Sequence, residues 1–74
     1  MDIKIYGSEK CGKCKIIKDK LEKKGVEFYY TDDVEETLEM ADKVGRRDLP
    51  ISIVDGKFVD YIGMVKLIRE MKNG

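Results

Sequence analysis

The first part of the chain changes its hydrophobic period twice, and this restricts the fold more than any other feature. Ile3 and Ile5 alternate with polar neighbours, as residues of a half-buried β-strand do. Residues 11–24 then carry apolar side chains at helical spacing, and Gly25 is a natural end for that helix. Alternation returns in residues 26–30. Strand, helix and strand in this order predict a βαβ unit with two parallel strands.

The next stretch predicts a second helix, which runs from residue 33 to residue 44. Asp33 and Glu36 have the spacing of a capping box at its start, and Gly45 ends it. The residues expected on its buried face are Val34, Leu38 and Ala41, with Met40 and Val44 beside them.

The last part of the chain predicts a β-hairpin and a third helix. Residues 51–54 and 57–60 are the two strands, joined by Asp55-Gly56, a sequence typical of a type I′ turn. Gly63 precedes a final helix whose apolar face comprises Met64, Leu67, Ile68 and Met71. The predicted order is β-α-β-α-β-β-α, and 74 residues allow one domain, residues 1–74.

Composition excludes several classes of function. The chain has 15 Lys and Arg against 15 Asp and Glu, so it lacks the basic excess typical of nucleic-acid binders. It has no histidine, which excludes hydrolases built on Ser–His or Cys–His pairs. No apolar run approaches the roughly 20 residues that span a bilayer, and no signal peptide is visible. We therefore expect a cytoplasmic protein with neither a membrane nor a nucleic-acid partner.

Charge is segregated along the chain. Residues 10–24 hold seven lysines against Asp19 and Glu22, whereas residues 27–42 hold seven acids and no base. Two solvated helix faces would explain this pattern, and a positive rim near the cysteines is the functional interpretation.

The only two cysteines lie in the motif Cys11-Gly12-Lys13-Cys14, between the first strand and the first helix. This spacing suits a redox-active dithiol, because one helical turn brings residues i and i+3 close enough to form a disulfide. The helix N-terminus and nearby lysines favour a thiolate at Cys11. Cys14 falls on the apolar helix face, where it should keep its proton. We predict that Cys11 attacks a disulfide and that Cys14 resolves the mixed disulfide.

Other interpretations of the cysteine pair stay open. They are a structural disulfide, a zinc site shared between two subunits, and a module that binds Cu(I) or an iron–sulfur cluster. Copper chaperones of about this length also place a CxxC motif after their first strand. They carry Met two residues before the first cysteine, where this chain has Glu9, and they end on a strand. The favoured prediction assigns no metal ligand.

Four features occur in an order that resembles a glutaredoxin or glutaredoxin-like redoxin. They are the first strand with its cysteine motif, residues 45–50 ending in Leu49-Pro50, the hairpin at residues 53–56, and Gly63. The resemblance implies an α/β, thioredoxin-like fold of the glutaredoxin type, with a mixed four-stranded sheet and helices on both faces. It also implies a thiol–disulfide oxidoreductase that reduces protein or glutathione mixed disulfides. No bound cofactor is expected, because the two sulfurs carry the electrons.

The resemblance further implies where the substrate binds. Pro50 would follow a cis peptide bond beside the cysteines, and Leu49 would offer its backbone N–H and C=O to a bound peptide or glutathione. The other residues expected at the substrate are Lys13, Gly63 and Met64, with Arg46 and Arg47 as partners for glutathione carboxylates.

The chain also departs from the usual glutaredoxin pattern at positions that contact glutathione. The replacements are Gly12-Lys13 for Pro-Tyr, Ser8 for Lys, Asp48 for Thr, and Gly63-Met64 for a Gly-Gly pair. A bulky residue after the glycine resembles the redoxins that serve ribonucleotide reductase. The implied partners are thus a disulfide-containing protein such as ribonucleotide reductase, and either glutathione, as a co-substrate, or thioredoxin reductase as the electron source. We expect a monomer.

Overall fold

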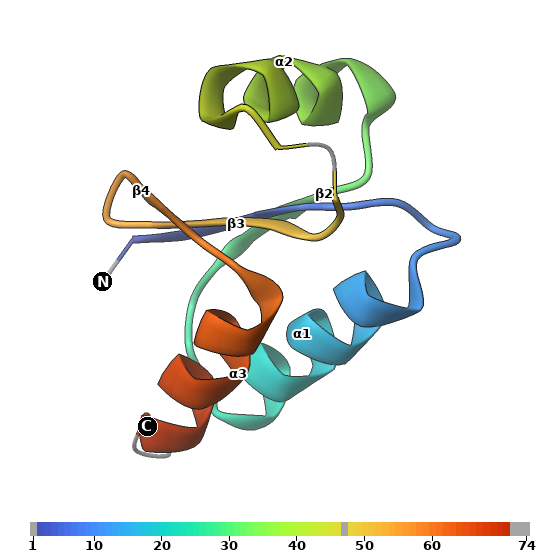
Figure 1. Cartoon of the computed structure of the whole chain (residues 1–74). Helices are drawn as coiled ribbons and strands as arrows, with labels where there is room; N and C mark the ends of the chain where they lie inside the picture. Colours follow the sequence, from blue (N-terminus) through green and yellow to red (C-terminus); the bar gives the residue numbers. More distant parts are fainter. Residues whose placement is uncertain (1, 47, 72–74) are drawn as a thin grey trace.

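The computed structural model describes residues 2–46 and 48–71 (Figure 1). The elements are β1 (Ile3–Tyr6), α1 (Gly12–Lys23), β2 (Tyr29–Thr31), α2 (Val34–Val44), β3 (Ile51–Val54), β4 (Lys57–Val59) and α3 (Tyr61–Glu70). Their order confirms the predicted β-α-β-α-β-β-α arrangement. None of the helices in this described part of the chain is long and apolar enough to cross a membrane.

The four strands form one mixed sheet in the order β2-β1-β3-β4. β1 pairs in parallel with β2 and antiparallel with β3, and β3 pairs antiparallel with β4. Figure 1 shows α2 on one face of the sheet, with α1 and α3 together on the other. The predicted sheet and the placement of helices on both of its faces are confirmed.

The core is split between the two faces of the sheet, because successive side chains of a strand point to opposite sides. Ile3 and Ile5 of β1 pack toward α1 and α3. Tyr6 packs toward α2. The buried residues of the first cluster are Ile3, Ile5, Ile17, Leu21, Met64 and Ile68. Those of the second are Tyr6, Ala41, Ile51 and Ile53.

The second strand is shorter than the sequence predicts, because the residues at the start of the predicted strand form the end of α1 instead of pairing with β1. Gly25 has a positive φ of 69°. Its N–H donates to the carbonyl of Glu22, and the N–H of Val26 donates to the carbonyl of Leu21 at 3.3 Å. This is a Schellman ending, which holds Val26 at the helix terminus. Pairing with β1 therefore begins only at Tyr29.

The predicted buried face of α2 is right for Ala41, Met40 and Val44, which pack in or against the core, and wrong for Val34 and Leu38. Val34 and Leu38 are 67% and 60% exposed, whereas Thr37 and Ala41 are the buried residues of this helix. The Thr37 hydroxyl donates a buried hydrogen bond to the carbonyl of Gly7 at 3.3 Å. This bond requires Thr37 to face the sheet, which turns Val34 and Leu38 outward.

The predicted capping box at the start of α2 is also wrong. Asp33 is the N-cap, but its side chain makes no cap hydrogen bond. The Glu36 carboxylate instead accepts from the hydroxyls of Tyr29 and Thr31, at 3.0 and 2.8 Å. The Thr31 oxygen in turn accepts from the N–H of Asp33 at 3.1 Å. Glu36 thus ties α2 to β2.

The hairpin turn is confirmed, since Asp55 and Gly56 have positive φ angles of 51° and 82°. The start of the last helix differs from the prediction. Asp60 is not a strand residue but the N-cap of α3, and its carboxylate accepts from the N–H of Gly63 at 2.7 Å. Gly63 therefore lies in the first turn of α3 rather than before it.

Candidate active site

The two cysteines lie one helical turn apart at the start of α1. Cys11 is the N-cap, and its sulfur accepts a hydrogen bond from the N–H of Cys14 at 3.3 Å. The Cys11 side chain is partly exposed, whereas Cys14 is completely buried, and both thiols are free. The structure thus presents one accessible sulfur and one enclosed sulfur at the positive end of a helix.

Close packing around the buried sulfur depends on Gly7. A Cβ atom at this position would lie 2.7 Å from the Cys14 sulfur and 2.8 Å from its Cβ, which is too close for either to stay in place. Burial raises the pKa of the Cys14 thiol to about 12, and its interaction with Cys11 adds to this shift. Cys14 therefore holds its proton in the reduced protein, as the sequence predicts.

Hydrogen bonds to two elements, β2 and α2, hold the loop between β1 and α1. The Gly7 N–H donates to the carbonyl of Thr31 on β2 at 2.9 Å, and the Gly7 carbonyl accepts from Thr37 on α2. Ser8 shapes the rest of the loop. Its hydroxyl accepts from the N–H of Lys10, and its carbonyl accepts from the N–H of Cys11 at 3.1 Å. The position of Cys11 is thus fixed relative to the sheet.

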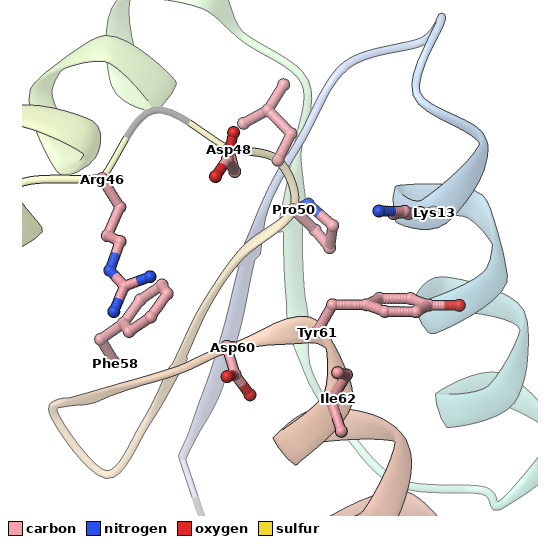
Figure 2. Close-up of a pocket in the computed structure, with 9 residues that line it drawn as sticks. Lys13, Arg46, Asp48, Pro50, Phe58, Asp60, Tyr61 and Ile62 are labelled. Carbon is pink, nitrogen blue, oxygen red and sulfur yellow. The ribbon is translucent and has the colours of Figure 1, made fainter.

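A cavity of about 610 Å³ opens beside the cysteine motif, at Lys13 (Figure 2). Its walls come from the start of α1, the loop before β3, β4 and the start of α3. The lining residues are Lys13, Arg46, Asp48, Leu49, Pro50, Phe58, Asp60, Tyr61 and Ile62. The Leu49–Pro50 peptide bond is cis, and Pro50 is buried.

Two cations in the cavity wall lie against aromatic rings. The Lys13 Nζ is 5.4 Å from the centre of the Tyr61 ring, and the Arg46 guanidinium carbon is 5.2 Å from the centre of the Phe58 ring. Figure 2 shows Arg46 beside Phe58, with Lys13 and Tyr61 across the cavity. Asp48 and Asp60 supply two negative charges. The cavity is therefore polar, with charges of both signs.

Comparison with known proteins assigns this arrangement to a family. Residues 3–59 match the family model of Glutaredoxin. The chain belongs to the glutaredoxin family. This glutaredoxin is also similar to the solved structure of the glutaredoxin-like protein NrdH-redoxin from Escherichia coli, which has a thioredoxin-like activity profile. The two are 27% identical with a TM-score of 0.76, over 100% of this chain and 99% of that chain. No curated protein matches the sequence.

The family and the two adjacent cysteines support a thiol–disulfide oxidoreductase. The structure brings several predicted site residues of this glutaredoxin together, since Lys13, Arg46, Leu49 and Pro50 all line the cavity. Arg47 lies outside the described residues.

Two predicted substrate-binding residues lie elsewhere. The Met64 side chain is fully buried in the core with α1 and β1, so it presents no surface to a substrate. Gly63 does not line the cavity, and its N–H is bonded to Asp60. Both expectations came from the glutaredoxin resemblance, in which Gly63 precedes the last helix. Because α3 begins at Tyr61, the residues that face the cavity are shifted toward the N-terminus.

Sequence reasoning missed four of the lining residues: Phe58, Asp60, Tyr61 and Ile62. The alternation of polar and apolar residues in its strand predicts that Phe58 packs on the sheet. It does pack there, against the second core cluster, and it lines the cavity as well. For Asp60 a signal exists, because Asp followed three residues later by a helical Gly is a plausible N-cap arrangement. Tyr61 and Ile62 carry no such signal, since apolar residues at a helix start are common in cores.

The cysteine pair has no further metal ligand nearby in the part of the chain that the structure describes. Within residues 2–46 and 48–71, no group of three or more His, Cys, Asp or Glu side chains could hold a metal ion. The two sulfurs, with Cys11 accessible and Cys14 enclosed, suit exchange with a disulfide.

Proposed function

We propose that this glutaredoxin reduces disulfides with the dithiol formed by Cys11 and Cys14. The observation that carries the proposal is the contrast between the two sulfurs. Cys11 is partly exposed at a helix N-terminus beside a cavity, and Cys14 is buried one turn later with a raised pKa. The exposed sulfur can reach a substrate, and the enclosed sulfur can reach only Cys11.

The proposed reaction has two exchange steps. The Cys11 thiolate attacks one sulfur of the substrate disulfide, which forms a mixed disulfide and releases the other substrate sulfur as a thiol after it takes up a proton. Cys14 then loses its proton and attacks the Cys11 sulfur. This step releases the second substrate thiol and leaves a Cys11–Cys14 disulfide. Two electrons pass from the protein to the substrate.

The cavity suits the chain that carries the substrate disulfide. Leu49 and Pro50 line it, and we propose that the Leu49 backbone pairs with an extended stretch of substrate. Lys13 and Arg46 offer positive charge to substrate carboxylates, while Asp48 and Asp60 offer acceptors to substrate amides. A peptide, which carries both kinds of group, fits this lining.

We further propose that a thioredoxin reductase restores the dithiol, with glutathione as the alternative reductant. The similarity to NrdH-redoxin over the whole chain supports this order of preference. Ribonucleotide reductase is the protein substrate that the sequence resemblance implies.

Single cysteine variants test the assigned roles. Cys11→Ser should abolish turnover of a small neutral disulfide such as bis(2-hydroxyethyl) disulfide, because no accessible sulfur remains. Cys14→Ser should form the mixed disulfide and stop there, which intact-mass spectrometry would detect as an adduct at Cys11. Turnover retained in Cys11→Ser would overturn the assignment.

Parallel assays of NADPH consumption test the electron source. One contains thioredoxin reductase, and the other contains glutathione with glutathione reductase. We expect turnover with thioredoxin reductase and little with glutathione. The reverse result would make this protein a glutathione-dependent glutaredoxin, with Arg46 as the cavity residue to test for glutathione binding.

A further inference from the structure

A groove runs between α1 and α3, the two helices that lie on the face of the sheet opposite α2 (Figure 1). It comprises two adjoining hollows of about 380 and 270 Å³ that share Lys20, Val65 and Arg69. We name it the basic groove, because five of its lining residues are positively charged: Lys20, Lys23, Lys24, Lys66 and Arg69. Among the described residues, no acidic side chain lines either hollow.

The charges of the basic groove surround an apolar floor. Val65 and Ile68 line the same hollow as the basic residues; Ile68 belongs to the core cluster, and Val65 packs against it. On α3, Ile62, Val65 and Arg69 follow one another at spacings of three and four residues, so they lie along one face of the helix. Positive walls over an apolar floor complement a ligand that carries both carboxylates and apolar side chains.

The basic groove leads directly to the candidate active site. Tyr61 and Ile62 line both the larger hollow of the groove and the 610 Å³ cavity beside the cysteine motif. Ile62 is 64% exposed, and Figure 2 shows it next to Tyr61 at the cavity edge. A chain that lies in the groove can therefore continue over these two residues to Lys13 and the cysteines.

The dimensions fit a short peptide segment. The stretch of α3 from Ile62 to Arg69 rises about 10 Å at about 1.5 Å per residue. An extended chain covers that length with about three residues at about 3.3 Å each. A few acidic and apolar residues next to a substrate cysteine would be sufficient to occupy the groove.

We propose that the basic groove docks an acidic, partly apolar segment of the protein whose disulfide this glutaredoxin reduces. The segment lies along α3 with its carboxylates near Lys66 and Arg69, and its apolar side chains rest on Val65 and Ile62. It thereby delivers the neighbouring disulfide to Cys11. This inference rests on the proposed function and adds the class of substrate that the site selects.

The test uses single-turnover exchange between the reduced protein and two oxidised peptides with the same disulfide. One peptide carries a flanking segment of Glu and Leu, and the other carries Lys and Leu. We expect the acidic peptide to react about tenfold faster at low concentration and low ionic strength. About 0.5 M salt should remove most of this preference.

Charge-reversal variants test whether the basic groove causes the preference for the acidic peptide. Lys66→Glu combined with Arg69→Glu should reduce the rate with the acidic peptide about tenfold, through weaker binding rather than a slower saturated rate. The matched control combines Lys43→Glu with Lys57→Glu, two exposed lysines that line none of the three hollows, and should keep the preference. Lys66→Gln with Arg69→Gln gives a milder version if the first variant folds poorly.

The outcomes separate this inference from the proposed function. If the wild type fails to reduce the neutral bis(2-hydroxyethyl) disulfide, the proposed function itself is wrong. If that disulfide is reduced but both peptides react equally, or the control pair removes the preference as strongly, the docking proposal is wrong. A labelled single-stranded oligonucleotide that binds the groove while the peptides react equally would identify a nucleic-acid site instead.

Discussion

At the scale of single residues, the two sulfurs differ in exposure because they occupy different positions at the start of α1. Cys11 stands at the N-cap, outside the first turn, and stays partly exposed. Cys14 points from the first turn into the core, against Gly7. The exposed sulfur is suited to attack a disulfide, and the enclosed sulfur is suited to resolve the mixed disulfide. The environment of the enclosed sulfur has consequences for stability that can be measured.

The raised pKa of Cys14 predicts a loss of stability at alkaline pH. The thiol has an ordinary pKa of 9.0 and a pKa of about 12 in the folded protein. Its burial as a neutral group therefore stabilises the reduced protein fully below pH 9, and this contribution is lost as the pH rises toward 12. Between these values the free energy of unfolding should fall by up to about 1.4 kcal/mol per pH unit from this group.

Urea denaturation of the reduced protein from about pH 8 to about pH 11 would measure this effect. The difference in free energy of unfolding between the wild type and Cys14→Ser should shrink above pH 9. Cys11→Ser keeps the buried thiol, and because burial is the main cause of the raised pKa, this control should still lose stability above pH 9. A difference that stays constant with pH would show that the Cys14 thiol does not titrate in this way.

Gly7 provides a steric prediction. The side-chain methyl of Gly7→Ala would collide with the Cys14 sulfur and Cβ, so the start of α1 must shift away from the sheet. We expect a loss of about 1–3 kcal/mol in the free energy of unfolding and slower closure of the Cys11–Cys14 disulfide. Gly12→Ala is a matched control, because nothing lies within 4 Å of a Cβ there. Equal effects of the two substitutions would contradict this account.

At the scale of elements, α2 illustrates how one polar contact can orient a helix. Its sequence offers Val34, Leu38 and Ala41 as a plausible apolar face, yet only Ala41 of these three is buried. Thr37 occupies the buried face instead, where its hydroxyl satisfies the carbonyl of Gly7. The helix that covers one side of the sheet is thereby linked to the loop that carries the cysteines.

Thr37→Val should show how much the hydrogen bond from Thr37 to the Gly7 carbonyl contributes to the free energy of unfolding. Valine keeps the size and branching of the side chain but leaves the Gly7 carbonyl without its side-chain donor, so we expect a loss of about 1–2 kcal/mol in the free energy of unfolding. Thr37→Ser keeps the hydroxyl and should retain the hydrogen bond. It loses only the packing of one methyl group, so its loss of stability should be smaller. Chemical denaturation of both variants would measure the difference, and greater stability of the valine variant would argue against the bond as the cause of the orientation.

At the scale of the whole molecule, the sheet gathers distant parts of the chain at one site. The cysteine motif, the Leu49-Pro50 segment and the start of α3 are far apart in sequence, yet Lys13, Pro50 and Tyr61 line one cavity. β1 and β3 form the interior of the sheet, each with a paired neighbour on both sides and helices over both faces. β2 and β4 are its edges.

This topology predicts the pattern of hydrogen exchange. Amides of β1 and β3 that bond across the sheet should exchange only when the whole molecule unfolds, because opening them breaks both core clusters. Amides of β2 and β4 should exchange faster, through local opening at the edges. Native-state exchange followed by NMR would measure this, and protection in β4 equal to that in β1 would contradict it.

The sequence by itself determined the order of the elements, the turn at Asp55-Gly56 and the position of the cysteines at a helix start. Each of these depends on local patterns, such as hydrophobic period, a glycine with positive φ, or spacing within one turn. It also singled out, by resemblance, Lys13, Arg46, Leu49 and Pro50, which all line the cavity beside the cysteine motif.

Only the tertiary structure decided which side chains of an element face inward. Thr37 faces the sheet because its partner, Gly7, lies 30 residues earlier in the chain. Tyr61 lines the cavity because α3 begins at Tyr61, directly after its N-cap Asp60, rather than after Gly63. The basic groove likewise exists only where α1 and α3 lie side by side. Hydrophobic period shows that a helix has two faces, but contacts between distant segments determine how that helix is rotated and what its surface can bind.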